Sequence, residues 1–312
     1  MTKILVTGGA GFIGSNLCRK LLELGNTVYC LDNLSSGSCE NIKDLNSNVN
    51  FMFYQHDIED KFVFNWEIDQ IYHLACPASP PFYQKNPIKT LDTNYLGTKN
   101  VLELARIKGS RVLLTSTSEV YGDPNISPQH EEYWGNVNPI GIRSCYDEGK
   151  RIAETLMIEY ERKYETEIRI ARIFNTYGPY MDKNDGRVVS NFINQMLEDD
   201  NITVYGNGTQ TRSFNYIDDT IEGLVLLMNT EDFRGPVNIG NDNEITINEL
   251  LDVIQSLLPE TESDIIFKTL PGDDPKQRRP DLKLAKDKLN WSPKTLLSDG
   301  LFKTIQYFVS IE

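Results

Sequence analysis

Short apolar runs alternate with amphipathic stretches through the first half of the chain. Apolar residues at helical spacing predict helices near residues 13–24, 91–108 and 146–164. The runs between them, rich in β-branched and aromatic residues, predict strands at residues 4–7, 27–31, 50–55, 70–74, 111–115 and 167–172. Strands that alternate with helices indicate a parallel sheet covered on both faces, so we predict the doubly wound α/β class.

The second half of the chain is less regular, with glycine, proline and asparagine recurring from residue 174 to 208. Helices are predicted near residues 217–229, 247–258 and 299–308. No repeat, low-complexity tract or linker separates the halves, so they are expected to pack closely. We predict one domain over residues 1–172 and a smaller lobe over residues 173–312, with some segments of the lobe returning to the first domain.

Charge and composition narrow the class of partner. The chain has 312 residues and a formal net charge of −14, which argues against nucleic acid or an anionic membrane as the main partner. No apolar run approaches the ~20 residues of a membrane-spanning helix. We expect no secretory leader, because the apolar run at residues 3–7 is short and enters a glycine-rich turn.

The cysteines and histidines point to no metal or disulfide chemistry. The five cysteines show no CxxC pairing and are expected to be reduced thiols, so we expect a cytoplasmic protein. The three histidines, His56, His73 and His130, have no metal-ligand spacing, and no metal site is predicted.

The glycine-rich turn follows the first predicted strand and opens a helix. Its residues Gly8, Gly11 and Gly14 allow a tight turn and a close approach to a pyrophosphate, whose charge a helix N-terminus favours. Asp32 closes the second strand, where a carboxylate would bind a ribose 2′-hydroxyl and repel a 2′-phosphate. The pattern therefore predicts NAD in preference to NADP. Asp57, after the third strand, is either an adenine contact or a solvated turn residue.

A tyrosine and a lysine stand four residues apart in the helix predicted at residues 146–164. This spacing places Tyr146 and Lys150 on one face, where the ammonium group is expected to lower the pKa of the phenol. Tyr146 would then take a proton from a sugar or alcohol hydroxyl. Beside a bound dinucleotide, this pair predicts NAD-dependent redox chemistry at a carbinol carbon.

Together with the glycine turn and this pair, residues 115–122 (Thr-Ser-Thr-Ser-Glu-Val-Tyr-Gly) resemble the extended short-chain dehydrogenase/reductase superfamily, in its nucleotide-sugar-modifying branch. The resemblance runs from end to end and implies a Rossmann sheet followed by a smaller C-terminal substrate-binding lobe. It also implies that Thr117 bonds the sugar 4-hydroxyl beside Tyr146, and that Lys150 bonds the nicotinamide ribose. The helices near residues 91–108 and 146–164 resemble the pair that superfamily dimers pack into a four-helix bundle, so a homodimer is expected.

Longer segments resemble the UDP-glucuronate decarboxylase (UDP-xylose synthase) family in particular. These segments are residues 73–81, 86–90, 133–141, 185–192 and 273–281. Sugar 4,6-dehydratases of the superfamily carry Thr-Asp-Glu where this chain has Thr117, Ser118 and Glu119, and a serine cannot serve as the acid that expels water. Plain 4-epimerases usually lack the acid found here at Glu119. One departure is Cys76, where the family more often has serine, and we expect little effect from it.

This resemblance implies an enzyme that decarboxylates UDP-glucuronate to UDP-xylose through a 4-keto intermediate. Oxidation at C4 places the C6 carboxylate β to a ketone, so CO2 leaves as the electrons flow into an enolate. Thr117 and Tyr146, near O4, would stabilise that charge. Protonation at C5 and return of the hydride to C4 regenerate NAD, and no net oxidation is expected.

The resemblance also supplies the expected site residues. Glu119 is expected to orient the carboxylate or a water, Arg278 to hold the carboxylate or the pyrophosphate, and Tyr205 to border the uracil or to be a core aromatic. The expected catalytic residues are Tyr146, Lys150, Thr117, Glu119 and Arg278. The expected NAD contacts are Gly8, Gly11, Phe12, Ile13, Gly14, Asp32, Asn33, Ser36, Gly37, Asp57, Ile58, Leu74, Ala75, Tyr146 and Lys150. The expected UDP-sugar contacts are Lys89, Ser118, Glu119, Asn175, Arg187, Tyr205, Gln210, Arg212 and Arg278.

Two other interpretations stay open. A UDP-sugar or uronate 4-epimerase would share the oxidation at C4 but leave the carbon count unchanged. A synthase that also releases the 4-keto pentose is a variant of the decarboxylase. From a different class, a non-catalytic NAD-binding regulatory protein would not require Tyr146, Lys150 and Thr117, all of which this chain has.

Overall fold

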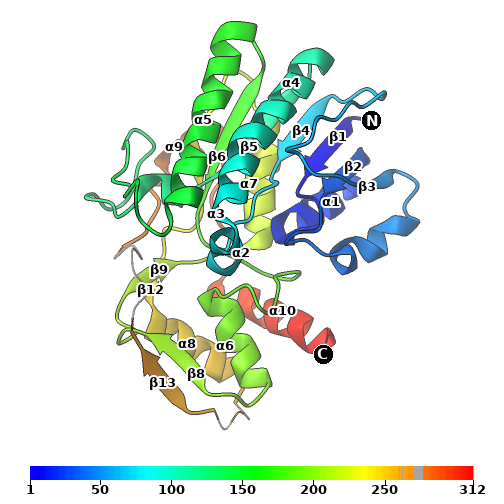
Figure 1. The fold of residues 1–312 in the computed structure, drawn as a ribbon. Helices are drawn as coiled ribbons and strands as arrows, with labels where there is room; N and C mark the ends of the chain where they lie inside the picture. The colour runs from blue at the N-terminus through cyan, green and yellow to red at the C-terminus, as the bar shows by residue number, and fades with distance from the viewer. Residues whose placement is uncertain (260, 262, 270–276, 312) are drawn as a thin grey trace.

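A parallel sheet forms the centre of the computed structural model, which describes residues 1–259, 261, 263–269 and 277–311 (Figure 1). Within these residues the sheet has seven strands in the order β11-β6-β5-β4-β1-β2-β3. The strands are β1 (Lys3–Thr7), β2 (Thr27–Asp32), β3 (Phe51–Gln55), β4 (Gln70–His73), β5 (Arg111–Thr117), β6 (Ile168–Ile173) and β11 (Val237–Ile239). All neighbouring pairs are parallel, so the predicted doubly wound class is confirmed.

Burial on both faces explains why five of these strands, β1, β2, β4, β5 and β6, could be predicted from the sequence. In the sheet centre, Val6 pairs with Cys30 on one side and Tyr72 on the other, and all three side chains are fully buried. Parallel strands covered on both faces read as continuous apolar runs. The seventh strand, β11, has only three residues and gives no such run.

Helices cover both faces of the sheet. On one face, α1 (Phe12–Glu23) packs against α7 (Ile217–Asn229). On the other, α4 (Thr98–Lys108) lies beside α5 (Ser144–Tyr164), as Figure 1 shows. These two layers bury separate apolar cores, with Leu17 in the first and Met157 in the second.

The helix predicted at residues 91–108 is divided in the structure. α3 (Pro87–Asp92) runs into a π-helical turn, η2 (Thr93–Gly97), before α4 begins. A Cβ atom on Gly97 would lie 2.4 Å from the Ile58 side chain, so this turn packs closely against the cofactor end of the cleft. Single π turns are rare in helices and are frequent at functional sites.

A second group of elements lies below the sheet in Figure 1. β8 pairs in parallel with β13, β9 pairs with β12 in antiparallel fashion, and α10 packs against α6 and α8. These elements are α6 (Val188–Leu197), β8 (Ile202–Tyr205), β9 (Thr211–Ser213), β12 (Glu244–Thr246), α8 (Ile247–Leu257), β13 (Ile265–Lys268) and α10 (Leu297–Ser310). The remaining elements of the described residues are η1 (Cys39–Ser47), α2 (Pro80–Lys85), η3 (Ser118–Tyr121), β7 (Thr176–Tyr177), β10 (Asn215–Tyr216) and α9 (Lys283–Leu289).

Parts of the second half of the chain belong to the upper layers. β11 extends the sheet beside β6, and α7 covers one of its faces, although both follow residue 172. The division into domains at residue 172 stays a prediction. Among the residues described, none of the helices combines the length and apolar character needed to cross a membrane.

Candidate active site

All residues predicted to contact cofactor or substrate line one cleft of about 1600 Å³. The residues that follow β1, β2, β4 and β5 form its upper wall, and α6, β8 and β9 contribute to its lower wall. The order of strands reverses between β1 and β4. In an open α/β sheet, ligands bind at such a switch point, outside the carboxyl ends of the strands.

The glycine turn leaves no room for side chains. Gly8 has a φ of +72°, and a Cβ atom on it would lie 2.7 Å from the backbone nitrogen of Ala75. A Cβ atom on Gly14 would lie 2.1 Å from the carbonyl oxygen of Gly8. The N-cap residue of α1 is Gly11, which has no side chain to bond the free N–H groups, and the first turn of the helix holds no acidic residue. The helix N-terminus therefore suits an anion, and the turn fits a dinucleotide.

Asp32 lies at the end of β2, beside this turn. Its carboxylate accepts hydrogen bonds from the backbone nitrogens of Ala10, at 3.0 Å, and Leu34, at 2.8 Å. Burial raises the pKa of the Asp32 carboxyl, while both hydrogen bonds oppose that rise. The Asp32 carboxylate thus lies at the end of β2 beside the glycine turn, where it was predicted to bind a ribose 2′-hydroxyl.

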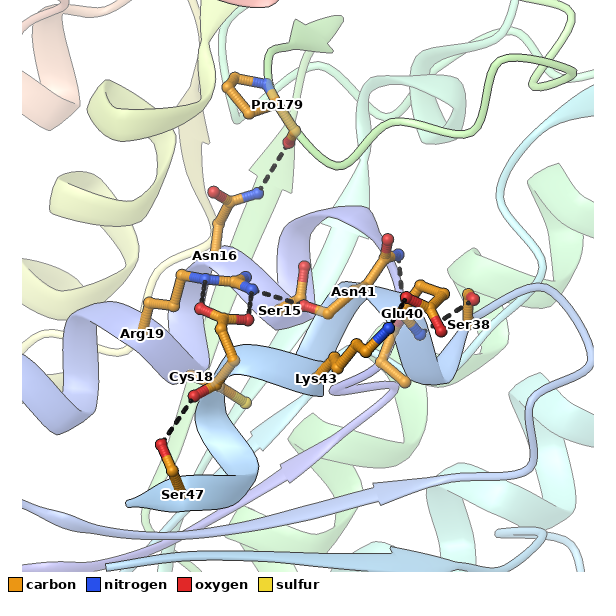
Figure 2. Close-up of polar contacts among 12 residues, drawn as sticks. Ser15, Asn16, Cys18, Arg19, Ser38, Glu40, Asn41, Lys43, Ser47 and Pro179 are labelled. Atoms are coloured by element: carbon orange, nitrogen blue, oxygen red, sulfur yellow. Dashed lines mark hydrogen bonds and ion pairs between the residues drawn. The ribbon is translucent and has the colours of Figure 1, made fainter. Parts of the chain in front are cut away.

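The segment after β2 is hydrogen-bonded to α1 and lines the cofactor end of the cleft. Arg19 donates to the carbonyl of Asn41 at 2.7 Å, and the Asn41 side chain donates to the carbonyl of Ala10 at 3.0 Å. Asn16, one turn earlier in α1, donates to the carbonyl of Pro179 at 3.0 Å (Figure 2). The α1 helix therefore anchors both the segment after β2, at the cofactor end of the cleft, and the segment after β7 that contains Pro179.

Lys89 and Asp57 meet at the same end of the cleft. The Lys89 ammonium lies 2.7 Å from both Asp57 and Glu59, and Asn33 donates to Asp57 at 2.9 Å. Burial alone would raise the pKa of Asp57, but Lys89 and these hydrogen bonds hold it below its ordinary value. Lys89 was predicted as a UDP-sugar contact, whereas the structure groups it with the predicted cofactor contacts Asn33 and Asp57. Glu59 was not predicted, because only the fold brings it to Lys89.

Tyr146 lies in the first turn of α5 and is buried. Its ring stacks on Tyr83, with centroids 5.0 Å apart and planes inclined by 7°, and the Thr117 side chain lies near its hydroxyl. Burial raises the pKa of Tyr146, so the predicted lowering is wrong for this structure. The physical reason is that desolvation outweighs nearby cations, and the Lys150 ammonium is directed to the carbonyl of Thr115, at 2.9 Å.

Glu119 is held between two guanidinium groups. Arg278 binds both carboxylate oxygens, and Arg143 approaches one of them at 2.6 Å. Burial would raise the pKa of Glu119, but the two arginines hold it below its ordinary value. Arg143 could not be identified from the sequence, since its contact with Glu119 spans 24 residues and depends on the fold.

Asp147 is a second buried carboxyl beside this group. Burial, reinforced by the charge of Glu119, raises its pKa to about 7, against the opposing effect of Arg143 and Arg278. One of its oxygens, Oδ1, has no hydrogen-bond partner among the described residues. Asp147 does not stand out in the sequence, because an acidic residue in the first turn of a helix is ordinary.

The lower wall holds further predicted cations. Arg187, at the start of α6, donates to the carbonyl of Ala78 at 3.0 Å, and the Arg212 guanidinium on β9 is buried. Tyr205 is exposed at the end of β8, so its alternative as a core aromatic is wrong, and its carbonyl accepts from Gln210 at 2.7 Å. Of the quoted segment 273–281, residues 273–276 lie outside the described residues.

Comparison with known proteins agrees with this geometry. The family model for GDP-mannose 4,6 dehydratase matches residues 5–304. UDP-glucuronic acid decarboxylase 6 of Arabidopsis thaliana is 56% identical over 302 residues, covering 96% of this chain and 86% of the relative.

Solved structures share the whole fold. UDP-glucose 4-epimerase from Thermotoga maritima, with UDP-glucose, is 31% identical, has a TM-score of 0.91, and is matched over 99% of each chain. UDP-glucuronic acid 4-epimerase from Bacillus cereus, in complex with UDP-glucuronic acid and NAD, is 30% identical and has a TM-score of 0.87 over 100% of each chain. The identity to the decarboxylase is far higher than to either epimerase, and the chain belongs to the GDP-mannose 4,6-dehydratase family and, within it, to the UDP-glucuronic acid decarboxylases.

Proposed function

We propose that this protein converts UDP-glucuronate into UDP-xylose and CO2, with NAD as a cofactor that is regenerated in each turnover. The buried pair of Glu119 and Arg278, close to Tyr146 and Thr117, carries this proposal. Oxidation at a carbinol carbon requires only Tyr146 and Thr117. Glu119 and Arg278 add a guanidinium group at the place where the carboxylate of a uronate would have to be bound.

The proton chemistry at O4 belongs to Tyr146 and Thr117. When bound, NAD supplies the acceptor that takes a hydride from C4 of the sugar and later returns it. Tyr146 accepts the hydroxyl proton, and Thr117, whose side chain lies near the Tyr146 hydroxyl, fixes the position of the oxygen. Because burial raises the pKa of Tyr146, the phenol needs a positive charge nearby, and Lys150 is the cation one helical turn along α5.

Loss of CO2 follows from the position of the ketone. With a carbonyl at C4, the C6 carboxylate is β to it, and the electrons of the breaking bond flow into an enolate. Thr117 and Tyr146 donate hydrogen bonds to the developing charge on O4. Arg278 orients the carboxylate across the cleft, and Glu119 orients a water or the carboxylate near C5.

The remaining cations are proposed to hold the diphosphate. Arg187 and Arg212 line the same wall of the cleft and offer planar N–H pairs that match phosphate oxygens. Asn175 lines the same cleft and is proposed to bind the diphosphate or the sugar, and Tyr205 and Gln210 are proposed to border the uracil. We propose accordingly that the lower lobe, mainly residues 173–312, binds the UDP-sugar while residues 1–172 bind NAD.

Carbon count separates this function from its nearest rival. We would follow UDP-glucuronate and catalytic NAD by proton NMR with the purified protein. UDP-xylose with CO2 and no net NADH is the expected result. UDP-galacturonate would replace the proposal with 4-epimerisation, and unchanged substrate despite bound NAD would contradict both. A persistent 4-keto pentose would identify the variant that releases its intermediate.

We further propose that the protein is a homodimer and works in the cytoplasm. Exposed apolar side chains on neighbouring turns of α3, η2, α4 and α5 support the dimer, because they would be covered in a bundle of paired helices. They are Leu91, Tyr95, Leu96, Ile107, Ile152 and Tyr164. Five cysteines, none of them in a disulfide in the structure, are consistent with a reducing compartment.

A further inference from the structure

The buried carboxylate of Glu119 forms ion pairs with two arginines from distant parts of the chain. Arg143 immediately precedes α5, and Arg278 lies ahead of α9, yet both contact Glu119. The side chains of Arg143 and Glu119 are only 14% and 11% exposed, so water replaces neither partner easily. The charge of Glu119 therefore depends on these two guanidinium groups.

Arg278 cannot serve Glu119 and a uronate carboxylate in the same way at once. The Nη1 and Nη2 groups of Arg278 donate to the two carboxylate oxygens of Glu119. This pair of N–H donors can make such a bidentate contact with only one carboxylate at a time. Once Arg278 turns to the substrate, Glu119 loses its bidentate partner. A buried carboxylate without a counter-charge takes up a proton instead.

We propose that Arg143 is a positioning residue that keeps Glu119 ionised and in place while Arg278 holds the uronate carboxylate. This inference rests on the proposed function. The other titratable side chains that face Glu119 are Asp147 and Tyr146 on α5 and Tyr83 on α2, and none of them carries a positive charge. Arg143 is thus the cation left to Glu119 when Arg278 is engaged.

The pH dependence of turnover tests this role. In Arg143→Met, the acid limb of kcat for CO2 release is expected to move at least one pH unit upward, with a tenfold or greater loss of kcat on that limb and a smaller change in KM. Arg143→Lys, which keeps the charge, is expected to recover most of the shift. Arg162→Met, which removes an exposed arginine paired with Glu159 on the same helix, should leave the profile unchanged.

A direct titration separates this inference from the proposed function. Carbon-13 NMR of glutamate-labelled protein reports the Glu119 carboxyl, assigned by its loss in Glu119→Gln. Arg143→Met should titrate at higher pH than wild type and Arg162→Met. An unchanged Glu119 titration, or an unchanged acid limb, would overturn the role of Arg143. If wild type releases no CO2, the proposed function fails, and the titration still decides this point. If Arg143→Met does not fold, Arg143→Gln gives the same comparison.

Discussion

At the scale of single residues, Tyr146 sits in surroundings that oppose its own ionisation. The ring is buried against Tyr83, and burial raises the pKa of the phenol. A base in such a place acts only when the site supplies compensating charge or transfers the proton onward. The cation proposed to supply that charge is Lys150, one helical turn along α5.

Tyr146→Phe removes the proposed base while keeping the stacked ring. We expect kcat for CO2 release to fall by about 10³-fold, within the usual contribution of general acid–base catalysis, while the NAD dissociation constant stays within about twofold. Tyr83→Phe is the matched control, since the Tyr83 hydroxyl is buried without a hydrogen-bond partner among the described residues. Turnover that survives in Tyr146→Phe, measured by NMR, would remove Tyr146 from the mechanism.

Asp147 makes stability depend on pH in a definite direction. Burial and Glu119 raise its pKa to about 7 in the folded protein, well above the ordinary value of an aspartate. For a raised pKa, the favourable contribution is complete at low pH and is lost as pH rises through the folded value. Asp147→Asn cannot ionise, so we expect it to be more stable than wild type by about 1 kcal/mol or more at pH 8, with a smaller difference at pH 5. Urea unfolding at both pH values measures this, and an equal difference at the two would contradict it.

At the scale of elements, the turn between β1 and α1 carries the cofactor prediction. Gly14→Ala would place a methyl group 2.1 Å from the carbonyl oxygen of Gly8, so the turn must shift. We expect the NAD dissociation constant to rise at least tenfold, because the helix N-terminus moves off the pyrophosphate position. Gly25→Ala, at the other end of α1, is the control. Its φ of +80° makes alanine strained there, but no atom lies within 4 Å of the new Cβ. Equal NAD affinity in both variants, by calorimetry, would contradict the expectation.

Elements were predictable from the sequence where burial is continuous. β1 and β5 read as apolar runs because both of their faces are covered, and α5 shows helical spacing throughout. β11 is too short to show a period, and α6 lies in a stretch whose glycines and prolines obscure its apolar face. Site residues that follow the strands were predictable as well, because the carboxyl ends of parallel strands lie at the same edge of the sheet.

What the sequence could not supply were contacts that depend on tertiary packing. Arg143 and Glu119, or Lys89 and Glu59, meet only after the sheet and its helices have formed. The pKa of Tyr146 was mispredicted for a related reason. Spacing along a helix places Lys150 near the phenol, but it says nothing of desolvation or of the carbonyl at Thr115 to which the ammonium donates.

At the scale of the whole molecule, the layer of α4 and α5 is the surface on which assembly is expected to depend. Figure 1 shows the two helices side by side on one face of the sheet, away from the lower lobe. α5 also carries Tyr146 and Lys150, so a partner packed on this layer would brace the catalytic helix. An association that covers α5 would therefore affect the position of the catalytic residues as well as the solubility of the protein.

Charge on this layer should separate the protomers. Ile152 is an exposed apolar residue on α5, and Ile152→Glu would bury a carboxylate in a paired-helix interface. We expect light scattering at micromolar concentration to give a dimer mass for wild type and a monomer mass for Ile152→Glu. Phe302→Glu, at an exposed position on α10, is the control and should remain dimeric. A monomeric wild type would refute the dimer. A dimer in all three proteins would instead move the interface away from α5, because a carboxylate cannot be buried there without a large loss of affinity.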